Sequence, residues 1–199
     1  MKMLTREQWL NDAIAEITPD FETLGFKVPT NIRVTCGWPS KSAGRSSKRR
    51  IGECWSENAS EDKTIEIIIS MVLSDHIEVL ETLVHELIHA IDHNKNGHKG
   101  PFKTMARAIG LGGKLTATSA GSDLKERLEE IKQKIGDYPH ATIDFSNRKK
   151  QTTRMVKIEC LDNIDCGMIF RTSRKWIDKA LNEDKTFLCP ACQAITKYS

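Results

Sequence analysis

The segment 80–102 constrains this chain more than any other, and it reads LETLVHELIHAIDHNKNGHKGPF. It contains His85-Glu86-x-x-His89, which places two imidazoles four residues apart. On an α-helix, residues four apart share one face at ~5–6 Å, so both side chains can reach one zinc ion. Glu86 projects beside such a metal, where a carboxylate can take a proton from zinc-bound water. The segment therefore predicts a helical zinc site with its own general base.

The same segment has the apolar periodicity of an amphipathic helix. At ~100° per residue, its apolar positions form a stripe whose centre lies roughly opposite His85 and His89. These apolar residues are Leu80, Leu83, Val84, Leu87, Ile88 and Ile91. One face of the helix can therefore enter a core while the other faces a cleft.

A catalytic zinc site needs a third protein ligand and an open position. His93 continues the helical series, but at ~1.5 Å per residue it lies ~12 Å from His85, too far to share an ion. We expect His93 to be a solvated residue at the helix end. His98 is better placed, because turn-forming residues precede it and can return the chain to the metal. These residues are Asn94, Asn96 and Gly97.

Two other zinc-ligand patterns bear on the choice of the third ligand. The metzincin pattern requires Gly and His where this chain has Asp92 and Lys95, so it does not fit. An acidic third ligand further along, Glu126 or Glu129, is not excluded by spacing. Asp92 is either an acceptor for a ligand imidazole or a plain surface residue.

HELIHA followed by GHKGPF resembles the SprT/Spartan family of zinc metallopeptidases, whose signature is HExxH, a short gap, a Gly-His turn and an aromatic residue. The resemblance implies that His85, His89 and His98 bind a catalytic zinc and that Glu86 is the base. It also implies an α+β fold with a zincin-like catalytic domain, in which a small sheet packs on the HExxH helix. His98 follows His89 by nine residues, closer than in the better-known members.

The 199-residue length fits one medium domain and a small one, and 39% hydrophobic residues are enough for a core. No apolar run approaches the ~20 residues of a membrane span, so we expect no membrane partner. The start of the chain, MKMLTREQWLND, has no apolar signal region. We therefore expect a cytoplasmic or nucleoid-associated location, where the six cysteines would not form disulfides. The sequence does not indicate the oligomeric state.

Local patterns predict the elements of a catalytic domain over residues 1–136. Helical patterns cover 5–18, 101–109 and 122–136, and strand patterns cover 31–36, 51–56 and 64–70, the last two as a hairpin. Cys36 and Cys54 fall in strands expected to be neighbours, and they are more typical of small core residues than of a pair. A sheet edge above the metal helix would bind substrate as an added strand. A loop is expected at residues 110–113, and the segment TATSAG at 116–121 could line the cleft, although nothing chemical singles it out.

A linker is expected at 137–154 and a four-cysteine zinc ribbon at 155–199. The cysteines are Cys160-x5-Cys166 and Cys189-x2-Cys192, and the second pair is a standard zinc knuckle. The first pair is looser, so a ribbon that packs without metal stays open. The unit is near the ~40-residue limit for folding alone, so a structural zinc would supply folding energy. QTTRMVK, RTSRKW and CPAC in this half also resemble the C-terminal ribbon of SprT-like proteins.

Net charge is only +3, so any inference about nucleic acid depends on local clusters of cations. Clustered Lys and Arg release counterions from nucleic acid, and an aromatic ring can stack on unpaired bases. We expect DNA, single-stranded DNA above all, to bind these clusters, although solvated loops and a Trp176 inside the ribbon core are the alternative. The candidate residues are Lys48, Arg49, Arg50, Arg148, Lys149, Lys150, Arg171, Arg174, Lys175 and Trp176.

Two functions are consistent with these features. The first is a zinc-dependent endopeptidase with one catalytic and one structural Zn²⁺; the family resemblance implies a protein substrate associated with DNA or crosslinked to it. The second is a nucleic-acid-binding zinc protein, a regulator of transcription or replication with little or no proteolytic activity. Glu86 favours the first, because a purely structural zinc site closes with four protein ligands and needs no base.

Overall fold

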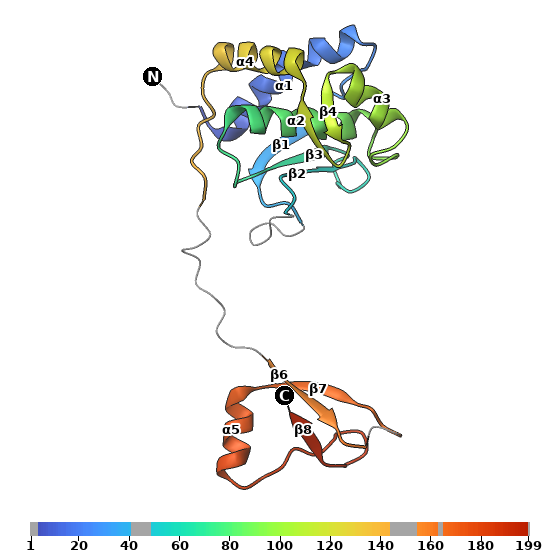
Figure 1. Ribbon diagram of the computed structural model, residues 1–199, viewed down its shortest axis with the longest axis vertical. Helices are drawn as coiled ribbons and strands as arrows, with labels where there is room; N and C mark the ends of the chain where they lie inside the picture. Colours follow the sequence, from blue (N-terminus) through green and yellow to red (C-terminus); the bar gives the residue numbers. More distant parts are fainter. Residues whose placement is uncertain (1–3, 41–48, 144–154, 163–164, 199) are drawn as a thin grey trace. The chain divides into compact units, whose positions relative to one another are not determined.

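The computed structural model in Figure 1 describes residues 4–40, 49–143, 155–162 and 165–198. The chain divides into two compact units, Met1–Ser146 and Asn147–Ser199. Both units mix helices with small sheets, so the α+β class is confirmed. Among the described helices, none has the length and apolar character needed to cross a bilayer.

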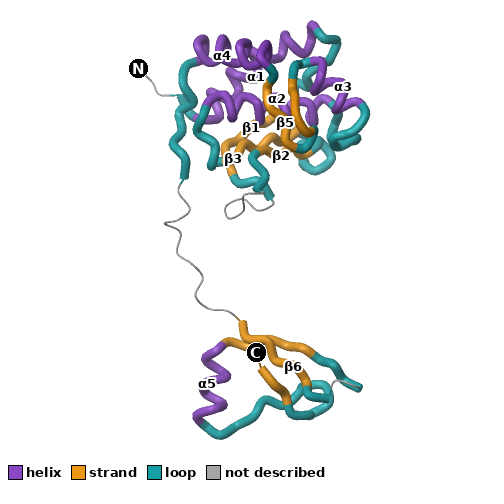
Figure 2. The backbone as a smooth tube through the Cα atoms, in the orientation of Figure 1, coloured by secondary structure: helices purple, strands orange, loops and turns teal. Residues whose placement is uncertain are grey.

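A three-stranded sheet forms one layer of the first unit (Figure 2). Its strands are β1 (Ile32–Gly37), β2 (Gly52–Trp55) and β3 (Ile65–Ser70), in the order β1-β3-β2. β2 and β3 form the expected antiparallel hairpin, whereas β1 runs parallel to β3. The central β3 therefore separates Cys36 from Cys54. The expectation that these cysteines lie in neighbouring strands was wrong, because β1 reaches the far side of β3.

The helix α1 (Arg6–Thr23) begins with the Thr5–Gln8 capping box that the sequence predicts. It runs past the predicted end at residue 18, with Pro19 inside it. A proline in a helix interior typically costs ~3 kcal/mol because it removes one hydrogen bond and crowds the preceding turn. Phe21, which follows it, is fully buried in the core. Packing of this last turn outweighs the local preference.

The helix α2 (His76–Ile91) packs on the sheet through contacts with β2 and β3. Asp75 caps its first turn, accepting a hydrogen bond from the backbone of Glu78 at 2.9 Å. The alternating isoleucines of β3 are fully buried, as their period of two predicts. They are Ile65, Ile67 and Ile69. Helix α2 therefore has an apolar side in the core and an opposite side that can line a cleft.

Helix α4 (Ser122–Ile135) also packs on α1 and α2, through its buried residues Leu124, Leu128 and Ile131. Between α3 (Pro101–Ala108) and α4 the chain forms a two-stranded hairpin rather than the expected loop. Its strands are β4 (Leu111–Lys114) and β5 (Ala117–Ala120). The backbone N–H of Ala120 donates to Glu81 of α2 at 2.8 Å, which fastens the hairpin beside that helix.

The start of the expected linker, residues 138–142, packs on the first unit. Tyr138 is buried, with its ring centroid 4.9 Å from that of Trp9. His140 donates to the carbonyl of Met71 at 2.9 Å, and Thr142 donates to Ser74 at 2.7 Å. The sequence concealed these contacts because the segment is polar and its partners lie far away in the chain.

In its described residues, the second unit contains a three-stranded antiparallel sheet and one helix. The strand order is β7-β6-β8, with β6 (Met155–Cys160) in the centre between β7 (Ile169–Ser173) and β8 (Thr196–Tyr198). Helix α5 (Arg174–Asn182) follows β7 and buries Ile177. The described hydrophobic residues buried in this unit are few: Val156, Ile158, Cys160, Ile177 and Cys189.

Candidate metal centre and its cleft

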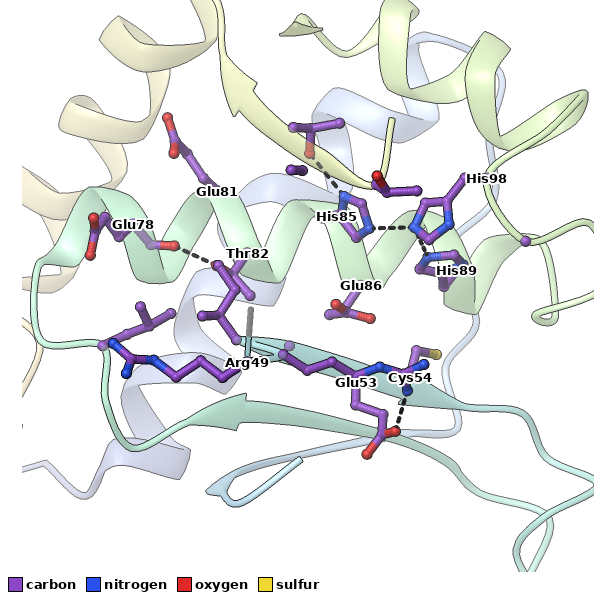
Figure 3. Close-up of a pocket in the computed structure, with 18 of the residues that line it drawn as sticks. Arg49, Glu53, Cys54, Glu78, Glu81, Thr82, His85, Glu86, His89 and His98 are labelled. Carbon is purple, nitrogen blue, oxygen red and sulfur yellow. Dashed lines mark hydrogen bonds and ion pairs between the residues drawn. The ribbon is translucent and has the colours of Figure 1, made fainter. Parts of the chain in front are cut away.

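Three imidazoles converge on the side of α2 that lines a cleft (Figure 3). The Nε2 atom of His98 lies 3.1 Å from Nε2 of His85 and 3.2 Å from Nε2 of His89. Tetrahedral ligands at ~2.0–2.1 Å from a zinc ion would lie about 3.3–3.4 Å apart. The three nitrogens therefore have nearly the separation that one zinc ion requires.

A tight turn after α2 returns His98 to the metal site. The backbone N–H and side-chain amide of Asn96 both donate to the Asp92 carboxylate, each at 2.7 Å. Asn94 and Gly97 take positive φ values of 56° and 54°, the left-handed conformation that Asn and Gly tolerate best. The predicted chain reversal is confirmed. Asp92 is buried and serves the turn, which neither of the two sequence-based alternatives anticipated.

Helix α3 packs against the imidazoles from the other side. The Phe102 ring centroid lies 4.5–5.0 Å from those of His85, His89 and His98. Phe102 is fully buried, so its position is fixed by the core. The aromatic residue of GHKGPF thus supports all three rings at once.

A threonine that the sequence did not single out orients the first histidine. Thr118 of β5 lies with its hydroxyl oxygen 2.8 Å from Nδ1 of His85. A hydrogen bond at one ring nitrogen fixes the orientation of the imidazole and leaves the other nitrogen for a metal. Because the pair is 33 residues apart, only the hairpin brings it together.

The surroundings keep these imidazoles neutral. Burial, together with the neighbouring histidines, lowers the pKa of His85 to about 3, and burial lowers that of His89 to about 4. Burial also lowers the pKa of His98. Neutral imidazole is the form that binds zinc, so no proton has to leave at neutral pH. In the described part of the chain, the buried Nδ1 of His89 has no hydrogen-bond partner. The donor set and its spacing fit a zinc ion.

Glu86 extends from α2 toward β2, next to the imidazoles but not among them (Figure 3). Its side chain is buried, which raises the pKa of the carboxyl group to about 8. A Cβ atom at Gly52 would lie 2.4 Å from Oε1 of Glu86 and 2.6 Å from Cγ2 of Thr82. Only glycine at position 52 therefore lets β2 pass so close to this carboxylate. Gly52 could not be selected from the sequence alone, because its partner is on another element.

A protein-family model covers the elements that build this site. The family model described as SprT-like family matches residues 16–121, just over half of the chain. The chain belongs to the SprT-like family. The matched region includes α2, the three imidazoles and Glu86, and it identifies a zinc-metallopeptidase-like unit. No curated protein and no solved structure gave a significant match.

The SprT-like unit has a cleft of about 770 Å³ over the imidazoles. One wall is α2, and the others come from β2, the hairpin and the turn that carries His98. Arg49 and Arg50, predicted as nucleic-acid contacts, line this same cleft. Lys48 lies outside the described residues.

The alternative ligands lie elsewhere in the SprT-like unit. Glu126 is exposed on α4, and Glu129 on the same helix lies 3.5 Å from His76, away from the imidazoles. His93 is exposed and contacts Glu57 at 3.1 Å, as expected for a residue beyond the helix end. Of these candidates, the structure brings only His98 to the pair on α2.

Outside the SprT-like match, four thiols converge in the second unit. The Sγ atoms of Cys160 and Cys192 lie 3.5 Å apart, and those of Cys166 and Cys189 lie 3.6 Å apart. Four sulfurs at ~2.3 Å from a zinc ion would be about 3.8 Å apart, so the cluster fits one ion. A hydrogen bond from the backbone of Cys192 lowers the pKa of Cys189 to about 7, which favours the thiolate. The looser Cys-x5-Cys pair joins the cluster.

The ribbon presents its aromatic residue to solvent. Trp176 on α5 is 52% exposed, while the adjacent Ile177 fills the core instead. The ammonium groups of Lys175 and Lys179 lie 6.0 and 5.4 Å from the Trp176 ring centroid. Arg171 and Arg174 are also exposed nearby in sequence, on β7 and α5. Arg148, Lys149 and Lys150 lie outside the described residues.

Proposed function

We propose that the SprT-like unit is a zinc-dependent endopeptidase that acts on proteins associated with DNA or crosslinked to it. The observation that carries the proposal is the buried carboxylate of Glu86 beside three converging imidazoles, all lining one open cleft. A site that only holds metal would complete its coordination with a fourth protein ligand. Here a group suited to proton transfer lies beside the ligands instead.

His85, His89 and His98 would hold the zinc. When bound, this ion would lower the pKa of a water molecule towards ~7 and polarise a peptide carbonyl. Glu86 accepts one proton from the attacking water as the oxygen bonds to the carbonyl carbon. It then delivers that proton to the nitrogen as the C–N bond breaks, which yields a carboxyl group and an amine. Its raised pKa suits both steps, since the group must gain and lose a proton near neutral pH.

The open edge of β2 supports a substrate bound as an added strand. The backbone N–H of Ser70 donates to the carbonyl of Ile51, and alternate residues of β2 then face β3. The N–H and C=O of Gly52 and the N–H of Cys54 therefore point away from the sheet. Because Gly52 lies against Glu86, a strand paired there would pass beside the base.

The second unit supports the DNA half of the proposal. Trp176 is exposed with two ammonium groups close to its ring, which is the combination that single-stranded nucleic acid binding uses. Binding there would raise the local concentration of proteins on the same DNA without changing the metal site.

The test is a proteolysis assay with Glu86→Gln as the key variant. Casein and a DNA-bound basic protein are offered to the wild type with no DNA, with single-stranded DNA and with duplex DNA. We expect cleavage by the wild type, with enhancement by single-stranded DNA for the DNA-bound substrate. Glu86→Gln should lower the rate ~10²–10⁴-fold and keep its zinc, because the amide is nearly isosteric but cannot accept the proton.

The matched control is Glu81→Gln, which changes a carboxylate one turn earlier on α2 that is engaged with Ala120. Its rate should stay within a few fold of the wild type. If the wild type cleaves nothing under any of these conditions but binds DNA, the alternative holds, and the chain is a nucleic-acid-binding zinc protein without proteolytic activity.

A further inference from the structure

The cleft contains an arginine that the mechanism above does not use. Arg50 lines it together with Glu86, His89 and His98. The side chain of Arg50 therefore opens into the same cavity as the candidate metal ligands and the base.

A buried carboxylate holds this arginine in place. Nη1 of Arg50 donates to Oε1 of Glu53 at 2.6 Å. Glu53 is 6% exposed and also accepts hydrogen bonds from the backbone N–H of Ser40 at 2.7 Å and from its hydroxyl at 2.5 Å. Burial raises the pKa of Glu53, but the bonds from Ser40 and Arg50 outweigh it and leave the pKa below its usual value. The carboxylate is therefore ionised and fixes the guanidinium.

Most of the donors on Arg50 remain free. A guanidinium has five N–H donors, and within the residues that the structure describes only one is used, by Glu53. The side chain is 47% exposed although its partner is buried. The group is thus anchored at one end and open to the cleft at the other, which is the arrangement needed to bind an oxygen atom of a ligand.

The position along β2 indicates which oxygen this would be. Arg50 lies two residues before Gly52, whose outward N–H and C=O would pair with the substrate beside Glu86. A substrate strand paired there would bring a carbonyl into the cavity that Glu86, which handles the proton, shares with the guanidinium. During hydrolysis that carbonyl oxygen gains negative charge, and a fixed cation with free donors stabilises it.

We propose that Arg50, positioned by Glu53, binds the carbonyl oxygen of the scissile peptide and stabilises the negative charge that develops on it. The inference rests on the proposed peptidase function and adds the oxyanion-stabilising residue to it. The proton taken up by Glu86 is the one delivered to the leaving nitrogen, and the guanidinium only donates hydrogen bonds.

The experiment compares Arg50→Ala, Arg50→Lys and the control Arg33→Ala, which removes a cation of β1 that does not line the cleft. The substrate is a short peptide spanning the first bond cleaved in casein, assayed without DNA. Loss of one oxyanion donor typically lowers kcat ~10²–10³-fold. We expect that loss in Arg50→Ala with KM within a few fold, partial recovery in Arg50→Lys, and little change in Arg33→Ala.

A second readout does not depend on turnover. A phosphinic peptide of the same sequence imitates the charged oxygens of the transition state. Its Kd, measured by calorimetry, should rise in Arg50→Ala by the same factor as kcat/KM falls. Zinc content and Tm should match the wild type. Glu53→Gln should give a smaller loss in kcat, because Arg50 keeps its charge but loses its anchor.

The remaining outcomes overturn the proposal. Equal losses in Arg33→Ala and Arg50→Ala would mean a general effect of charge. A rise in KM alone would mean ground-state binding, and unchanged peptide hydrolysis with weakened DNA binding would mean a phosphate contact. If Arg50→Ala loses zinc or unfolds, and Arg50→Lys folds but does not regain activity, the role of Arg50 is structural. A wild type that hydrolyses no peptide defeats the proposed function itself, and this inference with it.

Discussion

The two units hold their candidate metal sites in opposite ways. In the first unit the imidazoles lie on a large core, which contains fully buried side chains such as Trp9, Phe21 and Leu87. In the second unit the four thiols join segments that bury little else, while large apolar side chains such as Ile169 and Ile195 are more than half exposed. In the first unit the fold positions the metal ligands, whereas in the second the metal would have to hold the fold.

Breaking the second site should have the largest effect on the comparison. Changing Cys189 and Cys192 to Ser removes half of the thiol cluster, and we expect the chain beyond about residue 155 to unfold because metal binding is its main folding energy. The first unit should keep its own zinc. Zinc analysis should fall from two ions per chain to one, and limited proteolysis should degrade only the ribbon. One ion in the intact wild type, with a folded ribbon, would contradict this.

Breaking the first site should lower the affinity for zinc and leave the fold intact. His98→Ala removes one of three ligands, and we expect zinc affinity to fall more than ~100-fold, since even outer-shell partners of a ligand are worth ~10–100-fold. The Tm of the metal-free protein should change little, because the core is independent of His98. Glu126→Ala and Glu129→Ala are the controls. Normal zinc binding in His98→Ala, with a loss in either glutamate variant, would assign the third ligand elsewhere.

A milder change tests how finely the first fold positions its ligands. Thr118→Val keeps the shape of the side chain but removes the hydroxyl 2.8 Å from His85. Zinc affinity should fall ~10–100-fold, the usual effect of losing such a partner. Thr118→Ser keeps the hydroxyl and should stay near the wild type. Equal losses in both variants would indicate that packing of the hairpin, rather than the hydrogen bond, supports the site.

The smallest expected effect concerns DNA binding by the second unit, as distinct from peptide hydrolysis by the first. Trp176→Ala should weaken single-stranded DNA binding by ~1–3 kcal/mol, the usual value of one stacked base, and duplex binding by less. Hydrolysis of a short free peptide should not change, because Trp176 lies outside the unit that contains the cleft. Fluorescence titration with oligonucleotides measures the first effect. Equal weakening for both forms of DNA would argue against stacking.

Short-range features of the fold were predictable from the sequence. The capping box at Thr5 and the turn that returns His98 both depend on residues a few positions apart. Thr118 and Gly52 could not be assigned because their partners, His85 and Glu86, are on another element. Arg50 was selected from the sequence only as a nucleic-acid contact. Even where a residue type was informative, as with Pro19, burial of the following turn overrode its local preference.

The topology was harder to predict than the site. Strand patterns located β1, β2 and β3, but not that β1 joins β3 in parallel on the side away from β2. Neither the segment 110–121, whose first four residues were expected to form a loop, nor the expected linker at 137–154 contains a strong apolar period. The first nevertheless forms a hairpin against α2, and the start of the second packs through Tyr138. Such polar segments are placed by distant contacts that a single sequence does not reveal.

The edge of β2 is short, because the side-chain amide of Asn94 already donates to the carbonyl of Cys54 at 2.8 Å. Within the described residues, three outward backbone groups remain for a substrate, and at ~0.5–1.5 kcal/mol net for each hydrogen bond they sum to ~1.5–4.5 kcal/mol, a Kd of ~0.5–80 mM. With typical association rates of ~10⁵–10⁷ M⁻¹s⁻¹, a bound segment would stay for no longer than ~20 ms. The time that a protein spends near the cleft, more than its side-chain sequence, would then decide whether it is cut. A chain held nearby rebinds many times, whereas a freely diffusing chain dissociates after one encounter.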